Sequence, residues 1–383
     1  MRRDEIYPGW PRYVELRSGH EDGTHWLPAE VNTSIRPGWY YHPGEDHQVK
    51  SLTRLVDTYY ESVGRNGNFL LNLPVDTRGL VHETDELQLM RLKQQIDTDF
   101  AIELASSSKV SASNVRGNSA AFEVQNVIDG KNETYWATDD GIISATLTVD
   151  FAMPTEINRV LIQEYIALGQ RVKQFSIAAK VEGEWVSIEN QTTIGHKRIL
   201  RFNTVEATAL RLNIEDAKGP PLISNLEIYR APNLLVQPII ERNREGMVSL
   251  TVPETEVDVH YTLDGSAPSK DSKKYEAPFI LQTPTTLKAI AYDAESDKTT
   301  EPVSKYIDIP KKDWKVLSIS AGTHENIQNL MDENPETFWA TDNKTASPQE
   351  ISIDLGNDYT LNGFTYIPSQ ERYPFGIVTH YAF

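Results

Sequence analysis

The sequence "NVIDGKNETYWATDD" at residues 126–140 returns as "NLMDENPETFWATDN" at residues 329–343. The two stretches are identical at eight of fifteen positions, with a constant offset of 203 residues. With one inserted residue, "LTVDFAMPTEINRVLIQ" also aligns with "ISIDLGNDYTLNGFTYI". A match of this length predicts two copies of one domain rather than a short shared motif.

The regions around the two copies are rich in short predicted strands. From residue 105, runs such as "ATLTVDF", "INRVLIQEY" and "KQFSIAAKV" alternate with turn residues, which predicts an antiparallel sandwich or jelly roll over 105–231. Residues 232–310 are again all β and have the size of a small immunoglobulin-like sandwich. The second copy, 311–383, ends at "GIVTHYAF", so we expect a truncated half domain there.

The first segment, 1–104, has a different pattern. A strand in "WLPAEVNTSIRP", an amphipathic helix in "HQVKSLTRLVDTYYESVGRN", a strand in "GNFLLNLP" and a helix in "HETDELQLMRLKQQIDTDF" follow one another. The bare apolar run of the second strand is typical of a strand buried on both faces. This alternation predicts a parallel α/β barrel or a doubly wound sheet. Because a (β/α)₈ barrel takes about 250 residues, the segment is expected to be the last quarter of one, with its beginning cut away.

Composition narrows the function classes. The chain has 55 acidic and 37 basic side chains, and the formal charge of −18 argues against nucleic acid or an anionic membrane as a partner. It has no cysteine, which excludes disulfides and Cys-ligated zinc. The sequence predicts no membrane span and no signal peptide, so either the protein is cytosolic or its true start is missing.

Residues 105–231 resemble a discoidin, or coagulation factor 5/8 C-terminal type, domain, the fold shared by carbohydrate-binding module family 32. The stretches that carry the resemblance are "NVIDGKNETYWATDD", "LTVDF" and "SNLEIYR". In that family this loop often wraps a structural calcium ion, and Ca²⁺ prefers hard oxygen ligands. The matching oxygens here belong to Asp129, Asn132, Thr134 and Glu227.

The residues themselves leave an alternative open, in which Asp129 only caps the turn. In either case we expect the loop to act as a clasp rather than a binding site, with Trp136 in the core. Any ligand contact should lie on variable loops at the end of the sandwich, where Tyr165 and Arg171 are candidates. Residues 236–308, with "VDVHYTLDGSAPS" and "YEAPFIL", resemble the small sandwich found C-terminally in chitobiases, which is commonly a spacer.

The first segment also resembles a known family. The run from "WLPAEVNTSIRPGWYYH" through "SVGRNGNFLLNLP" is similar to the carboxyl-terminal end of the α-L-fucosidase barrel of glycoside hydrolase family 29, in the branch acting on 1,3/1,4-linked fucose. Asn32 departs from the Asp usual in that branch. The resemblance implies a retaining mechanism with an Asp nucleophile and a Glu acid/base about 5 to 5.5 Å apart, and no cofactor for catalysis. Both motifs belong upstream of the matched stretch, so this chain is expected to be inactive alone and Met1 to be an internal methionine or a start within a broken gene.

Three residues are candidates for binding the substrate. Trp39 resembles the aromatic side chain that packs on the apolar side of fucose, although packing at the barrel rim is an alternative. Glu30 and Arg36 are charged residues at or near the carboxyl end of a strand, where barrel sites are built. For Glu30, a role in a salt bridge is an equal alternative.

Taken together, these patterns predict a multidomain fold class: the C-terminal part of a (β/α)₈ barrel followed by antiparallel β-sandwich domains, jelly-roll discoidin-like and immunoglobulin-like. The resemblances imply a fragment of a periplasmic or extracellular exo-α-L-fucosidase that acts on fucosylated oligosaccharides or glycoproteins. The alternative from another class is a non-catalytic protein that binds galactose- or N-acetylhexosamine-type glycans through its discoidin-like modules.

Overall fold

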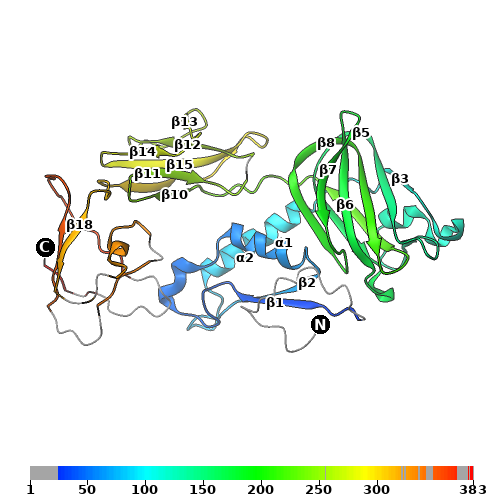
Figure 1. Ribbon diagram of the computed structural model, residues 1–383, viewed down its shortest axis with the longest axis horizontal. Helices are drawn as coiled ribbons and strands as arrows, with labels where there is room; N and C mark the ends of the chain where they lie inside the picture. Colours follow the sequence, from blue (N-terminus) through cyan, green and yellow to red (C-terminus); the bar gives the residue numbers. More distant parts are fainter. Residues whose placement is uncertain are drawn as a thin grey trace. The chain divides into compact units, whose positions relative to one another are not determined.

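The computed structural model divides the chain into two compact units, residues 1–232 and 233–383, and each holds two of the four expected segments (Figure 1). The structure describes residues 25–254, 256–320, 322, 325–334, 337–341, 348–368, 378 and 380–382.

Unit 1 begins with two strand–helix pairs. Strand β1 (Ala29–Ser34) pairs in parallel with β2 (Gly67–Asn72), as the alternation of elements predicts. Helix α1 (Leu52–Ser62) follows the first strand and α2 (Glu83–Asp99) follows the second. The side chain of Ser51 caps α1 by accepting a hydrogen bond from the Arg54 N–H, an arrangement typical of a helix start.

The expectation that the second strand is buried on both faces was wrong. Leu70 of β2 is 46% exposed, and side chains along the strand alternate between partly buried and exposed positions. Within the described residues β1 and β2 form a two-stranded sheet. Parallel strands are buried on both faces where other elements cover both, and nothing among the described residues covers the side of β2 that carries Leu70.

A first β domain, residues 105–231, completes unit 1. Its seven strands form one antiparallel sheet in the order β4-β9-β5-β8-β6-β7, with β3 paired to β5. The strands are β3 (Lys109–Ala112), β4 (Trp136–Ala137), β5 (Ala145–Glu164), β6 (Val172–Val181), β7 (Glu184–Gln191), β8 (Arg198–Ala217) and β9 (Leu222–Tyr229).

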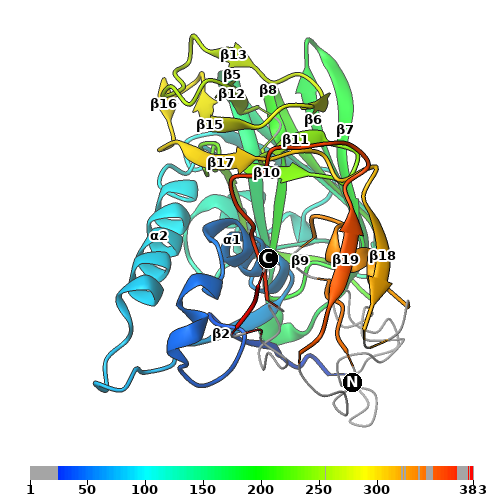
Figure 2. The same cartoon turned by 90° about the vertical axis from the view of Figure 1, so that its left-hand side faces the viewer.

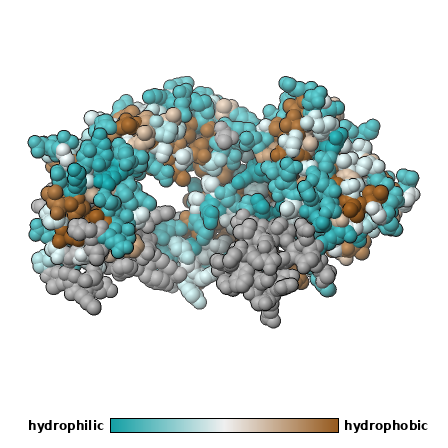
Figure 3. All heavy atoms as spheres, in the orientation of Figure 1, coloured by the Kyte–Doolittle hydropathy of each residue, from teal (hydrophilic) through white to brown (hydrophobic). Residues whose placement is uncertain are grey.

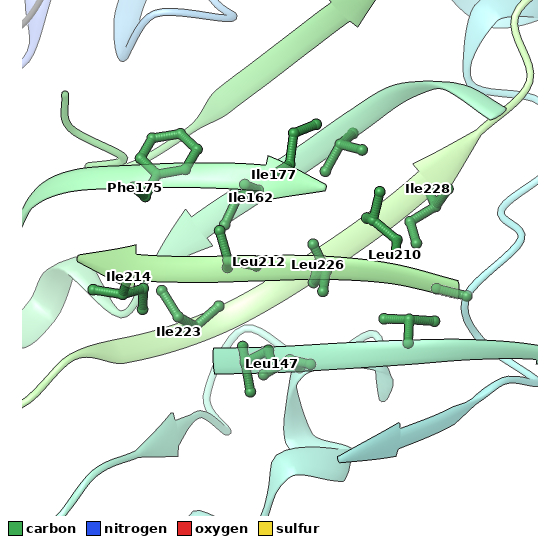
Figure 4. Packing of buried hydrophobic residues seen from close by; sticks show 14 of the residues in the cluster. Leu147, Ile162, Phe175, Ile177, Leu210, Leu212, Ile214, Ile223, Leu226 and Ile228 are labelled. Carbon is green, nitrogen blue, oxygen red and sulfur yellow. The ribbon is translucent and has the colours of Figure 1, made fainter. Parts of the chain in front are cut away.

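Two of these strands are twice as long as the sequence predicts. "ATLTVDF" and "INRVLIQEY" join into the 20-residue β5, and the runs near residues 200 and 210 join into the 20-residue β8. Their pairing shifts register between Asp150 and Thr155 and again between Ile157 and Arg159. Such irregularities bend strands, which lets one sheet curve around a single core of apolar side chains (Figure 4).

The helices of unit 1 pack directly against this β domain. The hydroxyl of Tyr60 on α1 donates a hydrogen bond to Asp99 Oδ2 at 2.6 Å, and Arg159 Nε on β5 donates to the same hydroxyl oxygen at 3.0 Å. All three side chains are buried, and burial raises the pKa of the Asp99 carboxyl. Phe100 meets Tyr229 edge to face, with ring centroids 5.1 Å apart. We call this set of contacts the seam.

Unit 2 begins with a second β domain, residues 233–310. One sheet holds β10 (Ile239–Arg242), β11 (Met247–Thr251) and β14 (Phe279–Ile280). The other holds β12 (Asp258–Thr262), β13 (Lys273–Lys274), β15 (Thr285–Asp293), β16 (Lys298–Thr299) and β17 (Val303–Ile307). Side chains from both sheets, such as Val248 and Leu287, share one core, so the domain is a two-sheet sandwich.

The second copy of the repeat follows. Strand β18 (Lys315–Ile319) pairs antiparallel with β19 (Ile351–Asp354), which lies beside it in Figure 2. The short helix η8 (Ile327–Leu330) stands where η6 (Val124–Ile128) stands in the first copy. Hydrophobic residues gather at the surface over β18 (Figure 3), and Leu317 is 66% exposed.

Candidate functional site

The carboxyl edge of the β1–β2 pair holds an open aromatic side chain. The segment after β1 turns over the end of β2, because Asn72 Nδ2 donates to the Trp39 carbonyl and to Ser34 Oγ, each at 3.0 Å. The Ile35 N–H donates to the Asn72 carbonyl at 3.0 Å. These bonds hold the backbone, while the Trp39 side chain remains 48% exposed. An exposed indole at this edge can pack on the C–H face of a sugar.

Arg36 occupies a different environment from the one expected of a substrate-binding residue. Its side chain is fully buried, with Nε 2.8 Å from Asp85 Oδ2 and Nη2 2.9 Å from Asp46 Oδ1. Its guanidinium also lies over the Tyr41 ring, 4.6 Å from the centroid. Asp85 belongs to the first turn of α2. Arg36 therefore ties the segment after β1 to the second helix and presents no donor to solvent.

Glu30 is also displaced from its expected position. It is the second residue of β1, toward the amino end, and its side chain is exposed. At about 3.3 Å per residue, it lies about 13 Å along the strand from the carboxyl end at Ser34. The structure therefore does not bring Glu30 to the edge that carries Trp39.

The residues matched to a calcium site form two separate hydrogen-bonded groups. Thr134 Oγ1 donates to Asp129 Oδ2 at 2.7 Å, and the Lys131 N–H donates to Asp129 Oδ1 at 2.8 Å. Glu227 accepts from Asn225 Nδ2 at 2.7 Å and from the Tyr229 hydroxyl at 2.5 Å.

Both carboxylates in this set are thus already occupied by hydrogen-bond donors, and Asn132 is exposed. Across the described part of the chain, no three His, Cys, Asp or Glu side chains cluster closely enough to hold a metal ion. The contacts match the alternative in which Asp129 caps a turn. The calcium role stays a sequence-based prediction.

The first β domain contains a cavity of about 610 Å³ at the loops that follow and precede its strands. This volume lies in the range of sites for small ligands. Its lining consists of Arg116, Phe122, Tyr135, Ala137, Asp140, Leu168, Arg171, Lys218, Gly219, Pro220 and Leu222. The Tyr135 ring stacks on Tyr165, with centroids 4.4 Å apart and planes at 20°.

Part of the repeated loop, which the sequence analysis interprets as a clasp, lines the cavity. Tyr135 lines the cavity, whereas its neighbour Trp136 is completely buried in the core, as expected, and donates Nε1–H to the Asn114 carbonyl at 2.9 Å. Successive side chains along a strand point to opposite sides. The same loop therefore places Trp136 in the core and Tyr135 in the cavity lining. That alternation is the sequence signal that could have identified Tyr135.

The two candidate ligand contacts, Tyr165 and Arg171, both lie at this cavity. Arg171 lines it and Tyr165 supports the Tyr135 ring. Reasoning from the sequence did not identify Arg116 or Lys218, which are distant in the chain and line the same cavity only in the folded domain.

A buried carboxyl group lies behind the cavity wall. Glu164 accepts backbone N–H bonds from Arg171 at 2.7 Å, Val172 at 2.9 Å and Gly195 at 2.7 Å. Burial raises the pKa of this carboxyl to about 7, against the three N–H donors, which favour its charged form. Glu164 therefore joins the cavity loop at Arg171 to the loop at Gly195.

The fold and the site define a multidomain chain with an α/β segment, a β domain with an aromatic-lined cavity, and further β domains. Residues 105–228 match the F5/8 type C domain family, and residues 248–306 match the Fn3 associated family. Within the ranges that the structure describes, no helix combines the length and apolar character needed to cross a membrane.

The chain is similar to α-L-fucosidases. It is 37% identical over 215 residues to a putative α-L-fucosidase 1 of Oryza sativa subsp. japonica, which covers 56% of this chain and 41% of that protein. It is 39% identical to the crystal structure of a putative α-L-fucosidase from Bacteroides thetaiotaomicron, with a TM-score of 0.54 over 57% of this chain and 48% of that one.

A third relative is a solved Ruminococcus gnavus GH29 fucosidase in complex with fucose. It shares 31% identity and a TM-score of 0.54, over 56% of this chain and 43% of that one. The chain therefore spans less than half the length of these relatives, and its homologues are α-L-fucosidases of glycoside hydrolase family 29.

Proposed function

We propose that this chain is the carboxyl-terminal part of an exo-α-L-fucosidase in which residues 1–104 close a (β/α)₈ barrel. Similarity to α-L-fucosidases over more than half of the chain supports this proposal. The parallel pairing of β1 and β2 agrees with it. The observation that carries it is the exposed Trp39 beyond the carboxyl ends of these strands, because barrel enzymes build their active sites at that face.

In this proposal the Trp39 indole packs on the apolar face of a terminal α-linked fucose. Arg36 takes no part in substrate binding, because Asp46 and Asp85 already engage its buried guanidinium. Glu30 is left out as well, because it lies toward the amino end of β1.

The reaction of the whole protein would follow the retaining scheme. One carboxylate forms a fucosyl ester, and the other protonates the leaving oxygen and then activates water. We assign both carboxylates to sequence outside these 383 residues, and we propose 1,3/1,4-linked fucose as the substrate and the periplasm or the extracellular space as the location.

The test has two readouts on the full chain. We expect no release of 4-nitrophenol from 4-nitrophenyl α-L-fucoside. Turnover that survives repurification and disappears in Glu30→Gln would mean that the catalytic carboxylates lie within this chain.

The second readout is binding of L-fucose by saturation-transfer NMR. We expect Trp39→Ala to abolish the transfer and Trp185→Ala, a tryptophan on β7, to leave it unchanged. Equal signals from both variants would remove Trp39 from the site.

The cavity of the first β domain favours a second function, glycan binding. Its loop position, its volume and the Tyr135–Tyr165 stack suit a sugar ring, for which we propose galactose- or N-acetylhexosamine-type residues. Glycan binding by this cavity does not require hydrolysis. The proposal therefore also applies if the protein binds glycans without cleaving them.

A matched pair of variants tests this second function. Tyr135→Ala removes an aromatic ring from the cavity lining, whereas Phe338→Ala changes the corresponding position of the second copy. On immobilised glycans we expect the first variant to lose at least ten-fold in retention and the second to behave as the parent chain. Loss in both, or in neither, would argue against the cavity as the binding site.

A further inference from the structure

The lining of the cavity in the first β domain has an unusual charge for this chain. Three basic side chains, Arg116, Arg171 and Lys218, line it together with one carboxylate, Asp140. The whole chain carries a formal charge of −18. A concave site with charge of one sign concentrates ligands of the opposite sign.

Arg116 is already neutralised within the cavity. Its Nη2 lies 2.8 Å from Asp140 Oδ1, and its Nη1 donates to the Thr138 carbonyl at 3.4 Å. This pair offers donors and acceptors of the kind that sugar hydroxyls need, but it contributes no net charge.

Arg171 has a fixed backbone and an accessible guanidinium. Its N–H is bound by buried Glu164 at 2.7 Å, and its carbonyl accepts from the Lys218 N–H at 2.8 Å. Its Nη1 donates to the Pro220 carbonyl at 2.8 Å. Among the described residues, Nε and Nη2 have no hydrogen-bond partner, so two donors of a planar fork remain for a ligand.

A guanidinium held in this way suits an anionic group. Its parallel N–H donors match the two oxygens of a carboxylate or sulfate, and such charge-assisted bidentate contacts are stronger than neutral hydrogen bonds. Lys218, placed beside Arg171 by their backbone hydrogen bond, is a second basic residue in the lining. Tyr135 and Phe122 supply aromatic surface for the sugar ring.

We infer that this cavity selects acidic glycans, with Arg171 binding a carboxylate or sulfate group and the aromatic wall packing on the ring that carries it. This inference rests on the proposed glycan binding by the first β domain and names the class of ligand.

Isothermal titration calorimetry on the full chain tests the inference with matched sugar pairs. The pairs are galactose and galacturonic acid, glucose and glucuronic acid, and N-acetylglucosamine and its 6-sulfate. We expect the acidic member of at least one pair to bind at least ten-fold more tightly than its neutral partner. Comparing the affinity gain in the first two pairs with that in the third shows whether the cavity prefers a carboxylate or a sulfate.

Three variants assign the effect to Arg171. Arg171→Gln keeps the backbone contacts with Glu164 and is expected to remove the preference for the acid, while affinity for the neutral partner changes less than two-fold. Arg171→Lys, which keeps the charge and loses the fork, should retain part of the preference. Arg211→Gln removes an equal charge outside the cavity, where the guanidinium lies 3.8 Å over Trp185, and should change nothing.

The contrary outcomes are distinct. Equal binding within every pair overturns the selection of acids and leaves glycan binding by the cavity intact. A preference that survives Arg171→Gln overturns the role of this residue. No binding of any sugar overturns the inference, and if Tyr135→Ala also leaves glycan retention unchanged, the proposed function of the cavity fails with it.

Discussion

The two copies of the repeated loop share their hydrogen bonds but differ in burial. Thr134 donates to Asp129 at 2.7 Å in the first copy, and Thr337 donates to Asp332 at 2.6 Å in the second. The N–H two residues after each Asp closes the same turn, at 2.8 Å and 2.9 Å. The loop conformation is therefore a local property of the sequence, present in both settings.

The tryptophans of the two loops differ sharply. Trp136 is completely buried, whereas Trp339 is partly exposed, and Ala137 is buried where Ala340 is exposed. In the first copy β9 pairs with β4 and covers the loop, and the described residues of the second copy provide β18 and β19 alone. Strands that are distant in the sequence thus bury the tryptophan of the loop. The fifteen-residue motif alone does not determine that burial.

The largest expected difference between the copies concerns these tryptophans. Trp136→Ala should lower the free energy of unfolding of unit 1 by about 3 to 5 kcal/mol, because it empties a filled core position. Trp339→Ala should cost unit 2 less than half as much. Hydrogen exchange of the slowest amides in each unit measures both values. Similar costs would mean that the second loop is buried as deeply as the first.

The next difference depends on pH. Glu164 aligns with Pro368 in the second copy, so only the first copy carries this buried carboxyl. Its pKa is raised to about 7, so the stability it contributes is full below its ordinary value near 4.5 and is lost as pH rises through 7.

We therefore expect the stability of unit 1 relative to Glu164→Gln to fall by about 3 kcal/mol between pH 4.5 and pH 8. The glutamine variant stays neutral and shows only a constant offset, because its amide nitrogen faces the Gly195 N–H. A constant difference across this range would show that the pKa of Glu164 is ordinary.

A third difference lies at one position of the turn. Gly130 has φ of +71°, and the corresponding Glu333 keeps φ of +66° despite its side chain. The Glu333 carboxylate is ion-paired with Arg242, whose side chain is 2% exposed, and with Lys311. The second copy thus accepts backbone strain in exchange for a buried contact with the second β domain.

Exchanging these residues tests that interpretation. Glu333→Gly should destabilise unit 2 by less than about 2 kcal/mol, because Arg242 keeps its ion pair with Asp308 and relief of strain returns about 1 kcal/mol. Gly130→Glu should cost unit 1 about 1 kcal/mol, since its surroundings are open. Stabilisation of unit 2 by Glu333→Gly would show that strain outweighs the ion pair.

The shared hydrogen bonds predict equal costs. Asp129→Ala and Asp332→Ala each remove the acceptor of one backbone N–H and one threonine hydroxyl, and each should cost about 1 kcal/mol. Hydrogen exchange within the two loops compares them directly. A clear excess at Asp129 would indicate a further partner in the first copy.

Calcium is the obvious further partner, and the smallest effect is expected from it. Because Asp129 and Glu227 are both occupied by hydrogen-bond donors, we expect 5 mM chelator or excess Ca²⁺, roughly saturating for weak sites, to leave the melting temperature of unit 1 unchanged. A rise of several degrees with Ca²⁺, absent in Asp129→Ala, would establish the calcium clasp.

Local patterns in the sequence predicted local structure well. Apolar spacing located α1, and the acidic residues of a first turn indicated α2. The parallel pairing of β1 with β2 agreed with the strand–helix alternation. The burial of Trp136 was also predicted. Each of these depends on periodicity within about twenty residues or on one large apolar side chain.

Features that depend on distant residues were missed. Arg36 is buried because Asp85 arrives from α2, forty-nine residues later. Leu70 is exposed, although it belongs to an apolar run, because no described residues cover its side of β2. The cavity joins Arg116 to Lys218 across the whole first β domain. In each case the partner, and not the residue itself, decides the environment.

The seam between Tyr60, Asp99 and Arg159 has a consequence for how unit 1 can be divided. Arg159 of the first β domain is buried against residues of α1 and α2. If residues 105–231 were produced alone, Arg159 would lose its hydroxyl partner, and the surface now covered by the two helices would meet water. The smallest portion of unit 1 that keeps the seam therefore includes both helices together with the first β domain.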